Sequence, residues 1–329
     1  MTSISGFSEY ATYLRGRHEG NPYFIYLDQN ILIDICEDKY TFSNNKKDVY
    51  WIYSGETLNE IRRSGNLAPL EVLKELSARK IEFIFDNDNI TESANILKLI
   101  DPYEVYEDYI VRSEENECSY GNDQLNYILV AFLFGADNYS DIENLPDDLL
   151  MHIESLAGPI DDLDDDTFQD ISNTLDKLQG FTSELSNKKR DSEYFRKSLG
   201  MGKNGAGDID EIDTITEIWN RIKGRLPDSL SCDNFFMFDP PSIEAFEAWS
   251  VVQGIVSSYL ILSRLGYKPD KGITNPNTLK NIISDSWHVG YGAYCDGIIS
   301  RDNRQLAKAQ AIYKHKKINS VAITATLKK

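Results

Sequence analysis

Four acidic side chains could together bind a metal ion if folding brought them to one place: Asp28, Glu60, Asp285 and Asp302. Clustered carboxylates without histidine or cysteine ligands suit hard divalent ions, above all Mg²⁺ or Mn²⁺. Such an ion relieves the repulsion between the carboxylates, activates water and neutralises charge that develops on a phosphodiester. The four acids therefore predict a metal-dependent nuclease.

Two of these acids follow predicted strands. Tyr23–Leu27 is a continuous apolar run, typical of a strand that is covered on both faces of a parallel sheet, and Asp28 comes next. Asp302 follows a second short strand over 297–300. Side chains just past the carboxyl ends of parallel strands face the ligand crevice. Asp is also a common helix N-cap, so capping is an equal alternative for Asp302, which precedes a helix from about Arg304.

The glutamate candidates lie on a predicted helix that Ser54 opens. Glu56 falls in its first turn, where a carboxylate compensates the helix dipole. Glu60 lies one turn further on, where that explanation no longer applies. Both glutamates are candidates on this reasoning.

Asp285 lies inside a predicted helix, 17 residues before Asp302. That spacing suffices to run down one helix and return along one strand, which brings the two carboxylates to the same sheet edge. Small residues that follow Asp285 would let the helix pack closely against the sheet: Gly290, Gly292 and Ala293.

The elements that must position these acids lie at the two ends of the chain. Strands are predicted over 23–27, 48–54, 80–85, 297–300 and 320–323, and helices over 1–20, 56–63, 68–79, 278–294 and 304–313. From Thr91 the pattern is helical for nearly two hundred residues, with helices predicted over 91–100, 102–112, 122–135, 146–157, 166–187, 190–198, 209–223 and 241–266. The fold class is therefore α/β: a parallel-sheet α/β/α domain formed by residues 1–90 and 275–329, interrupted by an acidic helical insertion over 91–274.

Three segments together resemble the PIN-like domain, the metal-dependent nuclease fold typified by bacterial toxin ribonucleases. Tyr26-Leu27-Asp28-Gln29-Asn30 is similar to the family's opening strand with its Asp-x-Asn end, although Gln29 replaces the usual Thr or Ser. Ser54 to Glu60 resembles the helix start that carries a glutamate after Thr-Leu, which favours Glu60 over Glu56. Asp285 through Asp302 resembles the closing pattern of Asp, helix, small residues, apolar strand and Ser/Thr-x-Asp.

The resemblance implies that Asp28, Glu60, Asp285 and Asp302 are catalytic metal ligands, with Asp296 either an accessory ligand or a structural acid. It further implies a Mg²⁺- or Mn²⁺-dependent endoribonuclease that leaves a 5′-phosphate and a 3′-hydroxyl. A toxin or phage-defence effector would fit that activity. The alternatives are a DNA-cleaving nuclease on the same fold, or a non-catalytic binding or regulatory protein on a nuclease-like scaffold.

Several residues near these acids could contact substrate. Asn30 could brace Asp28 by a hydrogen bond, and His288 lies three residues after Asp285 on the same helical face, where simple helix packing is an alternative. The candidate phosphate contacts share a positive charge and a place near the C-terminus: Arg301, Arg304, Lys308, Lys314, Lys316 and Lys317. An ordinary solvated helix would show the same lysines and arginines.

The charge of the chain is distributed unevenly. The formal net charge is −19, and residues 101–200 carry 24 Asp and Glu against 7 Lys and Arg, so they account for −17 of it. Residues 301–329 hold eight Lys or Arg and a single Asp. A basic end beside an acidic middle permits a polyanionic partner such as RNA, and the acidic segment could dock a regulatory protein or another copy of the chain.

No apolar run reaches the roughly 18–20 residues that a membrane-spanning helix needs, and 249–265 is predicted as a buried helix. The N-terminal residues lack the pattern of a signal peptide, so we expect a cytoplasmic protein. The cysteines have no C-x-x-C spacing and predict neither a zinc site nor a disulfide framework: Cys36, Cys118, Cys232 and Cys295.

Overall fold

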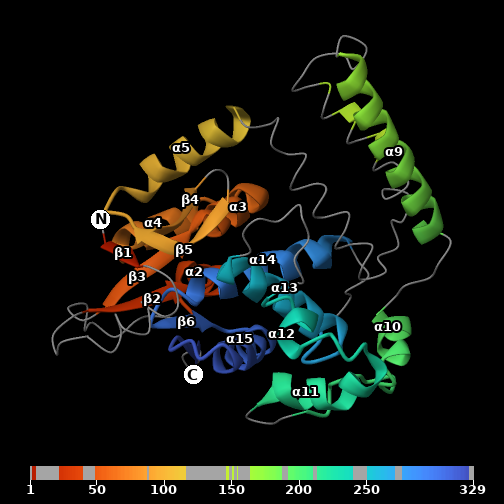
Figure 1. The fold of residues 1–329 in the computed structure, drawn as a ribbon. Coiled ribbons are helices and arrows are strands. Elements are labelled where there is room, and N and C mark those ends of the chain that lie inside the picture. The colour runs from red at the N-terminus through yellow and green to blue at the C-terminus, as the bar shows by residue number, and fades with distance from the viewer. Residues whose placement is uncertain are drawn as a thin grey trace.

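A mixed α/β sheet forms the centre of the molecule (Figure 1). The computed structural model describes residues 2–4, 22–39, 49–86, 89–115, 146–147, 150–151, 154, 164–186, 192–209, 213–239, 250–270 and 276–325. Within them the sheet has the strand order β1-β5-β4-β3-β2-β6-β7. Its strands are β1 (Thr2–Ile4), β2 (Tyr23–Leu27), β3 (Val49–Ser54), β4 (Arg79–Asp86), β5 (Asn89–Ile96), β6 (Gly297–Ser300) and β7 (Val321–Thr324).

Five neighbouring strands of the sheet run parallel to one another: β4, β3, β2, β6 and β7. The chain leaves β2 toward β3 and β4 on one side and returns to β6 on the other, so β2 and β6 are neighbours with Leu27 opposite Ile299. This reversal of strand order creates a crevice at the carboxyl ends of β2 and β6. The predicted α/β class and the positions of these parallel strands are confirmed.

The prediction that residues from Thr91 onward are helical is wrong at its start. Residues 89–96 form β5, which pairs antiparallel with β4, and β5 in turn pairs antiparallel with β1. Asp86 and Asn89 belong to a run of turn-forming residues that is typical of a hairpin. Thr2–Ile4 is likewise a strand and not the start of a helix over 1–20.

Helices cover both faces of the sheet (Figure 1). One apolar core joins Leu27, Tyr53 and Ile299 to helices α2 (Gln29–Cys36), α3 (Gly55–Ser64), α4 (Ala68–Glu75) and α5 (Pro102–Glu115). The other joins Tyr26, Ile52 and Ile298 to α11 (Thr214–Ile222), α13 (Val251–Arg264), α14 (Pro276–Gly292) and α15 (Asn303–His315). Successive strand residues face opposite cores, as the pleat requires.

Gly292 near the end of α14 permits the close packing that the sequence predicted. A Cβ atom there would lie 2.9 Å from the Ile298 Cβ of β6. Gly290 serves a different contact, because a Cβ at that position would meet Val252 of α13 at 2.7 Å. Small residues therefore bring α14 against both the sheet and α13.

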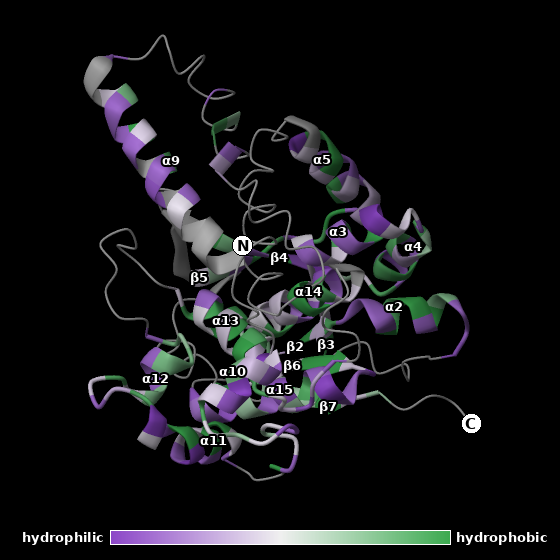
Figure 2. Cartoon of the chain, turned by 90° about the vertical axis from the view of Figure 1, so that its right-hand side faces the viewer, coloured by the Kyte–Doolittle hydropathy of each residue, from purple (hydrophilic) through white to green (hydrophobic). Residues whose placement is uncertain are grey.

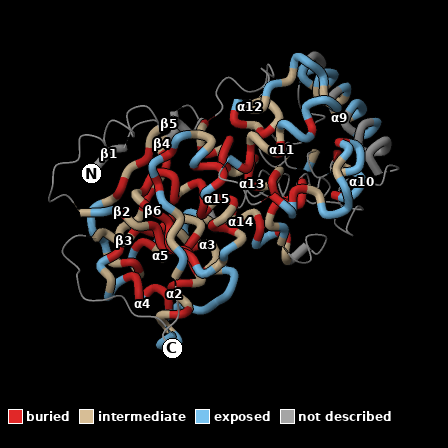
Figure 3. Tube along the Cα trace, turned by 90° about the horizontal axis from the view of Figure 1, so that it is seen from below, coloured by how far each residue is buried: buried red, intermediate tan, exposed pale blue. Residues whose placement is uncertain are grey.

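Parts of the segment predicted as an insertion differ in how they pack. Helices α11 and α13 bury apolar side chains in the same core as the sheet, whereas α9 (Asp165–Ser186) has no buried side chain among those described. Figure 2 shows α9 as largely hydrophilic, and Figure 3 shows buried residues concentrated around the strands. The division of the chain into two domains stays a prediction.

Other helices of this segment are α10 (Ser192–Ser198), the short 3-10 turn η4 (Lys223–Arg225) and α12 (Cys232–Phe235). The predicted helix over 122–135 and Cys118 lie outside the described residues, as does most of 1–20 and 146–157. In the part of the chain that the structure describes, every helix is too short or too polar to cross a membrane.

Candidate functional site

Asp28 lies at the crevice between β2 and β6, directly after the last residue of β2. It has extended backbone angles (φ −74°, ψ 148°) and caps α2, because its Oδ1 accepts a hydrogen bond from the Gln29 backbone N–H at 2.9 Å. Its Oδ2 accepts from the Ser300 hydroxyl at 2.6 Å and from the Asn30 amide. The carboxylate is therefore buried and fixed from both strands.

Asn30 is the link between the two strand ends. Its amide nitrogen contacts Asp28 and lies 3.0 Å from Ser300 Oγ, while its Oδ1 accepts from the Arg301 backbone N–H at 3.1 Å. The predicted bracing of Asp28 by Asn30 is present. The Arg301 guanidinium pairs with Asp34 of α2, with Nη1 2.6 Å from Asp34 Oδ1.

Helices α3 and α14 meet beside Asp28 through two pairs of residues that are each four apart. Glu56 and Glu60 face Ser284 and His288, as i, i+4 spacing allows on each helix. The Ser284 hydroxyl lies 2.5 Å from Glu56 Oε1 and 2.8 Å from Glu60 Oε1. Ser284 was not predicted, although its spacing from His288 was a visible signal.

His288 is completely buried between carboxylates, which agrees with the helix-packing alternative and not with a contact to substrate. Its Nε2 lies 3.1 Å from Glu60 Oε2 and 3.8 Å from Asp28 Oδ1. Its Nδ1 is 2.7 Å from the Tyr26 hydroxyl, which is 2.7 Å from Ser54 Oγ. Burial alone would lower the pKa of His288, but its contacts with Tyr26, Glu60 and Asp28 raise it well above the ordinary value, which favours the imidazolium.

The two glutamates differ in the direction of their pKa shifts. The Ser284 hydroxyl has one hydrogen to share between the two carboxyl groups. Burial raises the pKa of Glu56. For Glu60 burial also opposes ionisation, but His288 and Ser284 outweigh it and lower the pKa. Glu60 is therefore the more acidic of the two and the partner of His288, whereas burial favours the neutral form of Glu56.

Asp285 is the acid with the fewest contacts. It is half-buried on α14, and its carboxylate makes no hydrogen bond to any described residue. Burial, followed by the negative charge of Asp28, raises its pKa well above the ordinary value. Because Asp285 lies close to Asp28 and no hydrogen-bond donor contacts its carboxylate, a bound cation would stabilise its ionised form.

Asp302 acts as the N-cap of α15, as the alternative interpretation held. Its Oδ1 accepts from the backbone N–H groups of Arg304 at 2.7 Å and Gln305 at 3.2 Å. Its own N–H donates to Ser300 Oγ, the hydroxyl that also binds Asp28. Capping occupies one oxygen and leaves Oδ2 without a hydrogen bond to the described residues.

Two buried residues of the second core were not predicted in these roles. Lys308 is completely buried, with its Nζ 2.7 Å from Asp270 Oδ2, 2.9 Å from Ser263 Oγ and 4.1 Å from the ring centre of Tyr259. Tyr259 is also buried, and its hydroxyl has no partner among the described residues. Burial, and then the charges of Asp285 and other acids including Asp28, raise the pKa of Tyr259 well above the ordinary value.

Three sequence predictions are corrected by position. Lys308 is not a solvated phosphate contact, because it is buried in an ion pair. Asp296 lies at the start of β6, the end opposite Ser300, where its Oδ2 accepts from the Phe24 N–H at 2.7 Å; it is a structural acid. The last lysines follow the C-terminal end of α15, about 20 Å from its N-terminus for a helix of this length: Lys314, Lys316 and Lys317.

An open pocket of about 460 Å³ lies next to the strand ends. It is lined by Asn30, Arg301, Asp302, Asn303 and Arg304. Arg301 is exposed and Arg304 is partly exposed, and Arg304 Nε lies 3.8 Å from Asp302 Oδ1. The pocket thus combines arginines suited to phosphate with one of the predicted metal ligands.

The carboxylates surround His288 and do not converge on one point. Among the described residues, the group of three His, Cys, Asp or Glu donor atoms that all lie within 4.8 Å of one another is elsewhere, at Cys232, Asp233 and His315. The imidazole of His288 lies between Asp28 and Glu60. After burial, the negative charge of Asp28 is the strongest influence that raises the pKa of Asp285, so these two carboxylates are close to each other. Burial, and then repulsion from neighbouring carboxylates, raises the pKa values of Asp28 and Asp285. The oxygen donors suit a hard divalent ion, which would reduce that repulsion.

Comparison of the chain with protein-family models, curated proteins and solved structures gave no match.

Proposed function

We propose that this chain is a Mg²⁺- or Mn²⁺-dependent endonuclease that hydrolyses phosphodiester bonds, with RNA the favoured substrate. The observation that carries the proposal is the position of Asp28: buried at the switch point of the parallel strands, near Asp285 and joined through Asn30 and Ser300 to the arginine-lined pocket. The resemblance of the three sequence segments to the PIN-like domain supports the same function.

The groups proposed to hold the ion are Asp28, Glu60, Asp285 and the second oxygen of Asp302. Among the described residues no three of these carboxylates offer oxygens within 4.8 Å of one another, so binding would require their side chains to move closer together. When bound, the ion would supply charge neutralisation and an activated water. Asn30 and Ser300 orient Asp28, and Arg301 and Arg304 would bind the phosphates that flank the cleaved bond.

The test is cleavage of single-stranded RNA and DNA by the full-length chain with Mg²⁺, Mn²⁺ or EDTA, beside Asp28→Asn and Asp302→Asn. Asn is as good an N-cap as Asp, so both variants keep their helix caps. We expect each to lose about 100- to 1,000-fold in rate, which corresponds to about 2.7–4 kcal/mol of transition-state stabilisation.

Asp296→Asn is the matched control, because it changes an acid to an amide at the opposite end of β6, and it should retain activity. Cleavage that survives EDTA, or full activity of both Asp28→Asn and Asp302→Asn, would contradict the proposal. Preferential cleavage of DNA would identify the DNA-cleaving alternative. Growth arrest on expression that Asp28→Asn relieves would support a toxin or phage-defence effector.

A second candidate function is a non-catalytic binding or regulatory protein. The observation that favours it is the buried His288, whose positive charge already offsets Asp28 and Glu60. Absence of Mg²⁺ and Mn²⁺ binding by calorimetry, combined with co-purification of a stable partner, would support this function over the first.

A further inference from the structure

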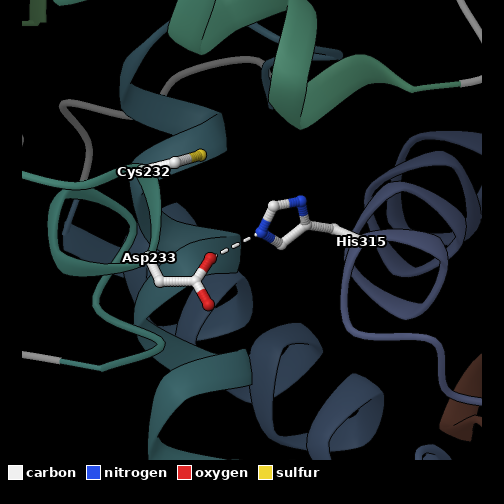
Figure 4. A group of neighbouring side chains, drawn as sticks. All are labelled: Cys232, Asp233 and His315. Carbon is white, nitrogen blue, oxygen red and sulfur yellow. Dashed lines mark hydrogen bonds and ion pairs between the residues drawn. The ribbon is translucent and has the colours of Figure 1, made fainter.

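A second cluster of metal-binding side chains lies at the C-terminal end of α15. It consists of Cys232 and Asp233 in the first turn of α12 and His315, the last residue of α15. One donor atom from each residue lies within 4.8 Å of the other two. Figure 4 shows the three side chains pointing toward one another, and His315 Nε2 is 2.7 Å from Asp233 Oδ1.

The local structure holds these side chains in place. Ser231 and Asn234 form a capping box that fixes the first turn of α12. The ring of Phe238 stacks on His315 at a centroid distance of 5.2 Å and an interplanar angle of 24°. Lys316 Nζ is 3.2 Å from Asp233 Oδ2, which leaves Oδ1 directed toward His315.

The donor set differs in kind from that of the acidic residues near Asp28. A thiolate sulfur, an imidazole nitrogen and one carboxylate oxygen are typical zinc ligands, whereas Mg²⁺ takes oxygen ligands alone. The cluster is partly exposed, so an ion and a water can reach it from solvent. The C-terminus of α15 adds the partial negative charge of a helix dipole, which favours a cation.

We propose that Cys232, Asp233 and His315 bind Zn²⁺, with the fourth coordination position open to water. Binding would release the Cys232 thiol proton to solvent, after which the thiolate and the carboxylate together balance the charge of the ion. The ion would tie residues 231–239 to the end of α15. This proposal is independent of the nuclease function and of the acids near Asp28.

Cobalt provides the test because a thiolate bound to Co²⁺ gives a near-ultraviolet charge-transfer band that carboxylates do not give. The reduced, metal-free, full-length chain should bind one equivalent with this band, and Zn²⁺ should abolish it by displacement. Cys232→Ser should lose the band. His315→Gln should bind Zn²⁺ more weakly by at least about tenfold, the loss that even indirect ligand contacts cause.

Matched controls separate this site from the other cysteines and from the acids. Cys36→Ser and Cys118→Ser remove other thiols and should retain the band, as should Asp28→Asn, and circular dichroism checks that each variant is folded. No band in the wild-type chain would overturn the proposal even if Cys232→Ser failed to fold. A band that persists in folded Cys232→Ser would also overturn it and leave Asp233 and His315 as an ion pair only.

Discussion

The two ends of α15 place charged groups in contrasting surroundings. At its N-terminal end, Asp302 caps the helix beside Asp28 and the switch point, and the first half of the helix buries Lys308 against Asp270. At its C-terminal end, His315 and Lys316 meet Asp233 in a partly exposed contact. The first end offers oxygen donors and buried charge, and the second offers sulfur, nitrogen and oxygen under solvent screening. The two proposals therefore assign different kinds of ion to the two ends of this helix, because burial and donor type differ along it.

The largest expected effect compares two lysines of this region. Lys308 is 0% exposed and pairs with Asp270 at 10%, whereas Lys316 and Asp233 are 27% and 39% exposed. Lys308→Met should lower the free energy of unfolding by about 3–5 kcal/mol, because it leaves Asp270 buried without its partner. Lys316→Met should cost less than about 1 kcal/mol. Urea titrations measure both, and equal costs would remove the contrast in burial.

The next comparison concerns two fully buried tyrosines near the acidic residues. Tyr26→Phe removes a hydroxyl that lies between His288 and Ser54 and should cost about 1–3 kcal/mol of unfolding free energy. Tyr259→Phe removes a hydroxyl with no partner among the described residues, so it should be close to neutral. Thermal melts of the two variants decide the point, and a larger cost for Tyr259→Phe would show that its hydroxyl has a partner.

A third prediction concerns pH and Mg²⁺. Burial raises the pKa values of Asp28, Glu56 and Asp285, so above their ordinary values of 3.8–4.5 the folded chain keeps protons that the unfolded chain releases. The raised pKa of His288 acts in the same direction above 6.5. For these four groups, stability is therefore lost as pH rises.

Mg²⁺ should compete with these protons. At about ten times its Kd it should add about 1.4 kcal/mol of stability, with a larger gain at about pH 8 than at about pH 6. Calorimetric melts of wild type and Asp28→Asn provide the measurement. A gain that does not change with pH, or that Asp28→Asn retains in full, would speak against metal binding by these acids.

The smallest expected effect is at the other end of α15. In metal-free protein Asp233→Asn should cost less than about 1 kcal/mol, since its ion pairs with His315 and Lys316 are partly exposed. With Zn²⁺ present the difference from wild type should grow, because the variant loses a charged ligand. Parallel melts with and without Zn²⁺ test this, and an unchanged difference would argue against the zinc site.

Local sequence patterns are sufficient to predict the parallel core and two of the acids at its edge. Apolar runs such as Tyr23–Leu27 form strands that are buried on both faces. Each strand ends where its apolar run ends, so the polar residues that follow lie at the strand ends. Helical spacing also placed Glu60 and Asp285 on helices next to the sheet. The prediction of helix over residues 91–96 is wrong because the strand pairing with β4 that decides their structure is a tertiary contact.

Which charged groups are buried, and which of them meet, depends on tertiary packing. Lys308 and Lys316 look alike in sequence, yet Lys308 is enclosed with Asp270 and Lys316 is partly exposed to solvent. Cys232 and His315 are 83 positions apart, and no spacing rule connects them. The physical reason is that burial and proximity are properties of packed surfaces. The sequence pattern specifies which face of an element is apolar, whereas the partner of each polar group depends on how α12, α13 and α14 pack around α15.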